Sequence, residues 1–515
     1  METKAQYPFV FGRDRKLLAK VLAAANVILV LAGVVCLLAL SYFVYHYGWT
    51  GQRQFSSAVG LAMYYGFPAG LAILLFAAAR LKAAYRIILA ISCLLLAASA
   101  YGVEVFLHLS DSTLSLQQIM AMPAQKRKKM AAKLATQFGV DIDARDRHEV
   151  IFDLRKEGID AVPLVWKSAV DIDVVPLGGI ANKLTVVCNQ NGKYLIYESD
   201  EHGFHNPRGM LQPGHVDIAA VGNSLTLGYC VPADRNFVGL IRGRYPATQN
   251  LGMTGEGPLR ILAILKEYAR LLKPRLVLWF YSEGSTFSEL RSEQQSPTLM
   301  RYLGDEFTQH LIARQSDIDQ ALTGDMDRQI AVERSRLAES QAKSLGNSGK
   351  LVGKLSGLIR LGALRQKLGL VYGTRTQEWD EPSELEGDMN LFRDILSKAK
   401  ARVSAWGGNL QFVYLPSWSR FAEESPVEVG VKSRMRILTI LRTLGIPLID
   451  ICPAFSGHGD PLSLFPFRRP GHYNDDGHRV VAETVLSYIS RPQPRDSSPR
   501  PSGNGEMQRA GKCSS

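Results

Sequence analysis

The sequence predicts an α/β protein with a parallel sheet, a helical insertion within the sheet domain, and three apolar membrane-spanning helices before it. Short apolar runs alternate with helix-period segments in the second half of the chain, a pattern typical of a parallel sheet covered on both faces. Long apolar runs fill the N-terminal region. A polar, helix-prone stretch without strand signals interrupts the later alternation.

Composition limits the classes of function. The chain has 515 residues, of which 46% are hydrophobic and 21% charged, and its formal net charge is +12. That balance fits a folded protein with membrane segments and room for two or three domains. No groove-reading motif or zinc-finger spacing accompanies the basic residues, so we expect no nucleic-acid partner. Neither CxxC nor HExxH occurs, and we therefore expect no metal and no cofactor.

Residues 1–110 are predicted to form the transmembrane part. Three apolar runs approach or exceed the ~20 residues that cross the hydrocarbon core; they cover residues 21–45, 57–79 and 87–107. Lys and Arg are dense before the first run and between the second and third, which predicts that the N-terminus is cytoplasmic. Three crossings then place the main domain outside the cytoplasm, periplasmic or at the cell surface, and two crossings would reverse this placement.

Residues 111–205 are expected to form a stalk helix and a small α+β segment. Residues 120–138 read as a basic amphipathic helix, which we interpret as a solvated stalk. Residues 184–197 alternate apolar and polar side chains around Asn191-Gly192, a hairpin signal. The six cysteines show no pair with diagnostic spacing.

Residues 206–490 are expected to form the main domain. Its predicted strands cover residues 217–221, 247–251, 276–281, 410–415 and 447–451, and its predicted helices cover 258–272, 389–406 and 427–444. A helical insertion is expected at about residues 291–380, with helical patterns over 314–345 and 351–370. We interpret the insertion as a cap or a surface for a partner protein rather than a lipid-contacting element. Residues 491–515 are rich in Pro, Ser, Gly and Arg and are expected to be disordered.

The junction at the first strand of this domain is the strongest functional signal. An apolar run ends in Gly222-Asn223-Ser224, which puts a hydroxyl at the carboxyl end of a predicted parallel strand, where open α/β sheets build their sites. Far downstream, His472 offers an imidazole that could accept the serine proton. The alternative is that Ser224 merely begins a helix, since serine is a common N-cap.

Four blocks in chain order resemble the SGNH/GDSL hydrolase family. They are Gly222-Asn223-Ser224, residues 250–255 (NLGMTG), residues 281–285 (YSEGS) and His472-Tyr473-Asn474. The match is closest to membrane-anchored, extracytoplasmic members, some of which are linked to acyl groups on exopolysaccharide. The resemblance spans about residues 198–490 and implies a flavodoxin-like (SGNH-type) parallel sheet.

The resemblance also implies roles for individual residues. Ser224 matches the nucleophile, and His472 matches the base because it is followed by x-Asn. The amides of Ser224 and Gly255 and the side chain of Ser285 match the oxyanion hole, whose donors stabilise the tetrahedral intermediate. Asn223 and Asn474 are expected to support the motif.

Three positions depart from the family pattern. Asn223 stands where the family usually has Asp, Ser285 stands where it has Asn, and Arg469 stands where it has the acid that orients the histidine. Asp460 could supply that acid from the preceding loop. Otherwise His472 acts in a Ser-His dyad or uses another acceptor.

A second histidine, His478, lies near the predicted base. We interpret it as a helix-start or surface histidine rather than a ligand. Asp475 and Asp476 then favour the N-terminus of the helix that follows. The Asp-x-x-His spacing of Asp475 and His478 is therefore not interpreted as a catalytic pair.

These observations predict a membrane-anchored, serine-dependent acyl-ester hydrolase or O-acyltransferase acting outside the cytoplasm. Its expected partners are the lipid bilayer and an acylated saccharide, with surface polysaccharide as the expected substrate. The alternative is a non-catalytic SGNH-like binding or assembly subunit, in which the three departures mark lost chemistry.

Overall fold

The computed structural model describes residues 15–45, 62–109, 114–165, 174–212, 214, 216–343, 382–422 and 427–490. The described residues belong to two units, the apolar helices up to residue 109 and the chain from residue 114 onward. The predicted amphipathic helix at 351–370 and the predicted disordered tail at 491–515 lie outside the described residues.

The N-terminal unit consists of α1 (Arg15–Phe43), the π-helix η2 (Ala62–Gly66), α3 (Phe67–Ala78) and α4 (Ala83–Leu109). Two of its stretches, Leu17–Phe43 and Ala83–Val103, are long and apolar enough to cross a membrane. The middle run yields only the shorter α3 among the described residues, so two of the three predicted spans are confirmed as helices of sufficient length and the third crossing stays a prediction. Helix α1 packs against α3 and α4, and a Cβ at Gly33 would lie 2.9 Å from the Phe76 ring.

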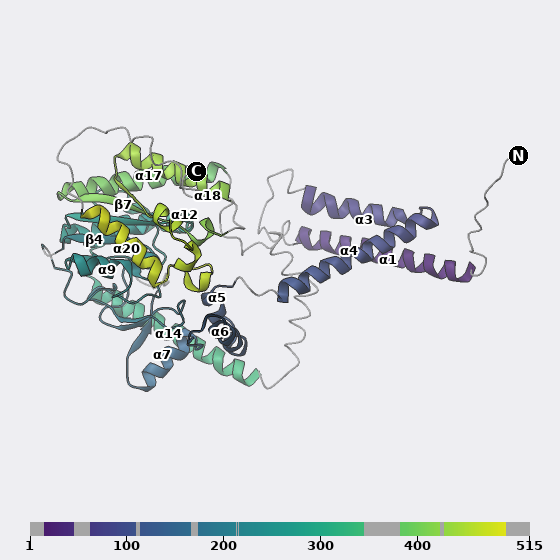
Figure 1. The fold of residues 1–515 in the computed structure, drawn as a ribbon, viewed down its shortest axis with the longest axis horizontal. Helices are drawn as coiled ribbons and strands as arrows, with labels where there is room; N and C mark the ends of the chain where they lie inside the picture. The colour runs from purple at the N-terminus through teal and green to yellow at the C-terminus, as the bar shows by residue number, and fades with distance from the viewer. Residues whose placement is uncertain are drawn as a thin grey trace. The chain divides into compact units, whose positions relative to one another are not determined.

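The second unit contains the predicted parallel sheet. Its strands are β4 (Ile218–Gly222), β5 (Thr248–Asn250), β6 (Leu276–Ser282), β7 (Asn409–Leu415) and β8 (Leu448–Asp450). They lie in the order β5-β4-β6-β7-β8 and all pair in parallel. Strands β4 and β7 of this sheet are labelled in Figure 1. All five predicted strands are confirmed to within a residue or two. The chain crosses from β5 over β4 to β6, so the strand order reverses there and opens a crevice at the carboxyl ends of β4 and β6.

Both faces of this sheet are buried, because successive side chains of a strand point to opposite faces. Ala219 and Val221 belong to one apolar core, and Ile218 and Ala220 belong to the other. The first core also contains side chains of α10 (Pro258–Ile264), α17 (Pro382–Ala405) and α18 (Val427–Leu444). The second contains side chains of α9 (Phe237–Arg244) and α20 (Asp475–Ile489).

The described part of the insertion is mainly helical, as predicted. It contains the end of α12 (Thr286–Gln294), α13 (Pro297–Arg301) and α14 (Gln315–Lys343). One stripe of α14, with side chains four residues apart, is buried in the first core: Ile318, Leu322, Met326 and Ile330. This stripe ties the insertion to the sheet domain. A partner protein at the insertion stays a prediction.

Residues 114–212 fold onto the sheet domain instead of forming a stalk. They contain α5 (Leu116–Met120), α6 (Ala124–Phe138), α7 (Arg147–Lys156) and a small sheet of β1 (Ala161–Pro163), β2 (Leu184–Val186) and β3 (Ile196–Glu198). Strands β2 and β3 form the predicted hairpin. The prediction of a solvated stalk is wrong for α6, whose Arg127, Ala131 and Leu134 are buried.

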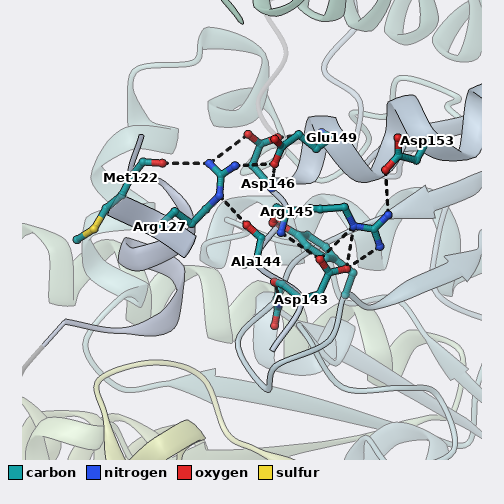
Figure 2. Close-up of polar contacts among 10 residues, drawn as sticks. Met122, Arg127, Asp143, Ala144, Arg145, Asp146, Glu149 and Asp153 are labelled. Carbon is teal, nitrogen blue, oxygen red and sulfur yellow. Dashed lines mark hydrogen bonds and ion pairs between the residues drawn. The ribbon is translucent and has the colours of Figure 1, made fainter. Parts of the chain in front are cut away.

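The physical reason is a network around Arg127, a side chain that the charge pattern would place in solvent. Its guanidinium donates to Ala144 O at 2.8 Å and Met122 O at 3.0 Å, and it pairs with Asp146 at 3.2 Å and Glu149 at 2.5 Å (Figure 2). Asp146 and Glu149 also form the capping box at the start of α7. One buried cation therefore fixes α6 against α7 and turns this segment into a defined structure.

Candidate active site

Ser224 is placed by the abrupt end of β4. Asn223 caps the short helix α8 (Ser224–Leu227), and its Oδ1 accepts from the Leu225 amide at 3.3 Å. A Cβ at Gly222 would overlap Thr226 Oγ1, so the residue before Asn223 must be glycine for the turn to close this tightly. Ser224 thereby lies at the carboxyl edge of the sheet, as predicted.

The structure brings Ser224 and His472 together. Ser224 Oγ lies 2.7 Å from His472 Nε2, although 248 positions separate the two residues in the chain. His472 lies on the loop between η6 (Pro466–Arg468) and α20, and its ring contacts the Tyr229 ring at a centroid distance of 4.6 Å. Burial lowers the pKa of His472 to about 4. The imidazole is therefore neutral at pH 7 and able to accept a proton.

The loop that carries His472 is strained and firmly held. Phe467 and Arg468 have φ of +54° and +57°, a left-handed conformation that is costly for residues other than glycine. The Phe467 ring contacts Phe138 of α6 at 5.2 Å. Arg469, at the position of the family's orienting acid, donates to Leu114 O at 2.6 Å. The residues before the imidazole are thus anchored on the 114–212 segment.

The partner of the second imidazole nitrogen is Gln190, which no motif in the sequence indicates. Gln190 Oε1 lies 3.1 Å from His472 Nδ1 and 3.2 Å from the His472 amide nitrogen. Asp460, the acid suggested by the sequence, has its carboxylate paired with Arg468 instead. The only available signal for Gln190 was its place in a predicted hairpin turn, where polar residues are common for local reasons.

The loop that carries Gly255 follows β5 and is fixed at both ends. At its start, Met253 donates its amide to Gly222 O at 3.2 Å. At its end, the Gly257 amide donates to Glu293 Oε1 at 2.6 Å, and burial raises the pKa of Glu293 to about 7. Gly255 itself has φ of +72°, so this position favours glycine.

Two departures from the family pattern are in direct contact. Asn223 Nδ2 donates to Ser285 Oγ at 3.0 Å and to Glu289 Oε2 at 3.4 Å. An aspartate at position 223 could not donate and would face the Glu289 carboxylate. The Ser285 hydroxyl accepts from Asn223 and keeps its own hydrogen for donation. Asn223 and Ser285 therefore form a compatible pair.

Ser224, Gly255, Ser285 and His472 line one cavity of about 660 Å³. Residues after the strand ends form one side of it, and the 114–212 segment forms another. The side chains from that segment include Gln117, Met120, Arg147, His148 and Tyr194. The four predicted site residues are therefore gathered around a space large enough for a substrate of several hundred cubic ångströms.

Asn474 and His478 support the helix that follows His472. Asn474 caps α20, with its Oδ1 accepting from the Gly477 amide at 3.0 Å, and its Nδ2 donates to Ser463 O at 2.7 Å. His478 lies in the first turn of α20 as expected, but it is fully buried rather than at the surface. Its Nδ1 accepts from the Phe237 amide at 3.1 Å. Within the described ranges, no group of three or more His, Cys, Asp or Glu side chains could hold a metal ion.

No protein-family model and no curated protein matches this chain. Among solved structures, it is similar to a lipolytic protein of the GDSL family from Desulfitobacterium hafniense, with 8% identity and a TM-score of 0.29 over 52% of this chain and 97% of that one. It is also similar to a lipase/acylhydrolase from Enterococcus faecalis, with 11% identity and a TM-score of 0.30 over 55% and 100% of the two chains. An acetylxylan esterase from Geobacillus stearothermophilus is similar at 12% identity and a TM-score of 0.28 over 56% and 100%.

Proposed function

We propose that this chain is a membrane-anchored, serine-dependent acyl-ester hydrolase or O-acyltransferase that acts outside the cytoplasm. The observation that carries the proposal is the 2.7 Å contact between Ser224 Oγ and His472 Nε2 at the edge of a cavity. A serine hydroxyl is a weak nucleophile until a neighbouring base takes its proton. The neutral, half-buried imidazole of His472 meets that requirement.

In the proposed reaction, His472 Nε2 takes the hydroxyl proton while Ser224 Oγ bonds to the acyl carbon. The carbonyl oxygen becomes an oxyanion, stabilised by the amides of Ser224 and Gly255 and by the Ser285 hydroxyl. The intermediate collapses as the ester C–O bond breaks, and His472 returns the proton to the leaving oxygen. A water molecule or a sugar hydroxyl then attacks the acyl-serine by the same steps, and the choice between them separates hydrolysis from transfer.

Membrane anchoring is supported by the two apolar helices, Leu17–Phe43 and Ala83–Val103. Placement outside the cytoplasm is supported by the disulfide between Cys188 and Cys230, since such bonds persist mainly in oxidising compartments. With a cytoplasmic N-terminus, this placement needs an odd number of crossings. We therefore propose that the apolar segment containing η2 and α3 forms the third membrane crossing.

An acylated saccharide is the substrate class we propose. Aromatic side chains around the cavity, including Tyr194, Tyr229 and Trp418, can pack their faces on the apolar faces of sugar rings. The cavity can admit part of a saccharide whose acyl group lies at Ser224. Surface polysaccharide is therefore the proposed natural substrate.

The test uses a fluorophosphonate probe on the full chain in detergent. A Ser224 Oγ–P bond forms, fluoride leaves and His472 takes the proton, so labelling reports the nucleophile and its base together. Labelling should disappear in Ser224→Ala and fall strongly in His472→Ala. Ser487→Ala, an exposed serine of α20, should label like the wild type. Absent labelling of the wild type, or unchanged labelling of Ser224→Ala, would contradict the proposal and favour the non-catalytic binding or assembly subunit.

A second assay separates the two proposed reactions. Protein that has not been treated with the probe is incubated with a radiolabelled acetyl ester and an oligosaccharide acceptor. Release of free acetate alone indicates a hydrolase, and radiolabel on the oligosaccharide indicates a transferase. Loss of both products in Ser224→Ala assigns them to the same site.

A further inference from the structure

The hairpin turn between β2 and β3 reaches across the domain to the imidazole of His472. Gln190 in this turn is 3% exposed, and a single oxygen of its side chain faces two nitrogens of His472. Gln190 Oε1 lies 3.2 Å from the backbone nitrogen and 3.1 Å from Nδ1. The two contacts share one acceptor atom, which makes the orientation of the amide decisive.

The backbone contact fixes that orientation. A backbone N–H can only donate, so the Gln190 atom facing it must be the carbonyl oxygen and not the amide nitrogen. The same oxygen then requires a hydrogen on His472 Nδ1. In the neutral imidazole, a hydrogen on Nδ1 leaves Nε2 with its lone pair, and Nε2 is the atom 2.7 Å from Ser224 Oγ. Gln190 therefore selects the tautomer that can receive the serine proton.

The remaining end of the Gln190 amide is also engaged. Gln190 Nε2 donates to Gln117 Oε1 of α5 at 2.6 Å. This bond uses the orientation already required by His472. A chain of hydrogen bonds therefore runs from Ser224 through His472 and Gln190 to Gln117, in the 114–212 segment that lines one side of the cavity.

The turn is rigid enough to hold Gln190 in place. The neighbouring amides make their own bonds, from Asn189 Nδ2 to Asp143 O at 2.9 Å and from Asn191 Nδ2 to Cys230 O at 3.1 Å. The Cys188–Cys230 disulfide ties the same turn to the stretch that follows α8. Gln190 is consequently fixed relative to both Ser224 and His472.

We propose that Gln190 is the positioning residue of this site, taking the place of the orienting acid by holding His472 in its Nδ1–H tautomer. The proposal rests on the proposed Ser224–His472 chemistry. As a neutral acceptor, Gln190 orients the imidazole without stabilising the charged imidazolium as a carboxylate would. The low pKa of His472, caused by burial, agrees with the absence of charge at this position.

Other ionisable groups surround the imidazole and set the background for any pH measurement. The acidic, basic and histidine side chains that line the cavity or lie behind the ring are Asp146, Arg147, His148, Glu283, Glu289 and His478, and the phenols are Tyr194, Tyr229 and Tyr473. All of them are retained in the variants below. A change in the pH profile between wild type and variant therefore reports the group at position 190.

The experiment compares Gln190→Met, Gln190→Glu and Lys193→Met by the pH dependence of fluorophosphonate labelling. Methionine has nearly the shape of glutamine but cannot accept from Nδ1–H, so labelling at pH 7 should fall about 10²-fold, the lower range for general-base catalysis. Glutamate keeps the acceptor and adds a charge, so its labelling should persist with the acidic limb moved up by about 1–3 pH units. Lys193 is exposed in the same turn, and Lys193→Met should match the wild type.

Wild-type labelling that vanishes in Ser224→Ala, together with unchanged rate and pH profile in both Gln190 variants, would overturn this inference and leave the proposed function standing. If Gln190→Met does not fold, the shift of the acidic limb in Gln190→Glu decides alone. A wild type that does not label would overturn the proposed function and this inference together.

Discussion

The base at position 472 should work in unusually acidic solution. Burial lowers the pKa of His472 to about 4, and the side chain on its Nδ1 is the neutral Gln190. Activity requires the unprotonated imidazole, so the rate should rise with pH through that pKa and stay level above it. At pH 5, about nine-tenths of an imidazole with a pKa of 4 is neutral, compared with about 3% at the ordinary value of 6.5. The expected advantage at pH 5 is roughly thirtyfold.

The assay is the fluorophosphonate labelling rate of the full chain between pH 3.5 and 8 at constant ionic strength. Half of the maximal rate should remain near pH 4. His472→Ala should label slowly and without this inflection, which ties the inflection to the imidazole. A wild-type profile that loses half of its rate near pH 6.5 would refute the reasoning, because it would mean that burial does not govern this histidine.

Unfolding must be measured in the same buffers. Burial also lowers the pKa of His478, to about 3. Below about pH 6.5, both imidazoles therefore take up protons when the protein unfolds, whereas in the folded protein they stay neutral until the pH approaches 4 and 3. Their contribution to stability is complete above the unfolded-state pKa of about 6.5 and is lost as the pH falls below it. Intrinsic fluorescence at each pH separates loss of the folded state from protonation of the base within it.

Asn223→Asp should lower the labelling rate about tenfold at pH 7, because a second carboxylate would then face Glu289; an unchanged rate would show that the asparagine amide is dispensable. Arg127→Met should lower the free energy of unfolding by about 3 kcal/mol, since it leaves two carboxylates and two carbonyl oxygens without their cation; chemical denaturation measures this, and a loss below about 1 kcal/mol would contradict the network. Cys188→Ser should lower stability by about 2–4 kcal/mol and slow labelling by loosening the turn above the base. Equal thermal midpoints with and without reductant in the wild type would argue against the Cys188–Cys230 bond.

The parts that could be predicted from the sequence are those specified by local pattern. Residues 217–221 and 276–281 are short apolar runs bounded by turn residues, and runs of that kind have few alternatives to a buried strand. The β2–β3 hairpin was visible in the alternation around Asn191-Gly192. Ser224 stood out because a glycine and an asparagine follow a strand immediately before it.

The errors came from side chains whose environment is made by distant parts of the chain. The charge pattern placed Arg127 in solvent, but it is buried against Asp146 and Glu149 from the next helix. The sequence offered Asp460 for the orienting role, and its carboxylate is paired with Arg468. His478 was expected as a helix-start or surface histidine, and the packing of α9 against α20 buries it.

The chain order of strands and helices and the identity of the candidate nucleophile and base were decided by the sequence alone, since both follow from residues adjacent in the chain. The tertiary structure decided what lies on the other side of the imidazole. Gln190 is 282 positions from His472 and carries no motif, so only the folding of the hairpin over the sheet edge brings its oxygen to Nδ1. Hydrogen bonds act over about 3 Å, and no pattern along the chain specifies which distant amide will come that close.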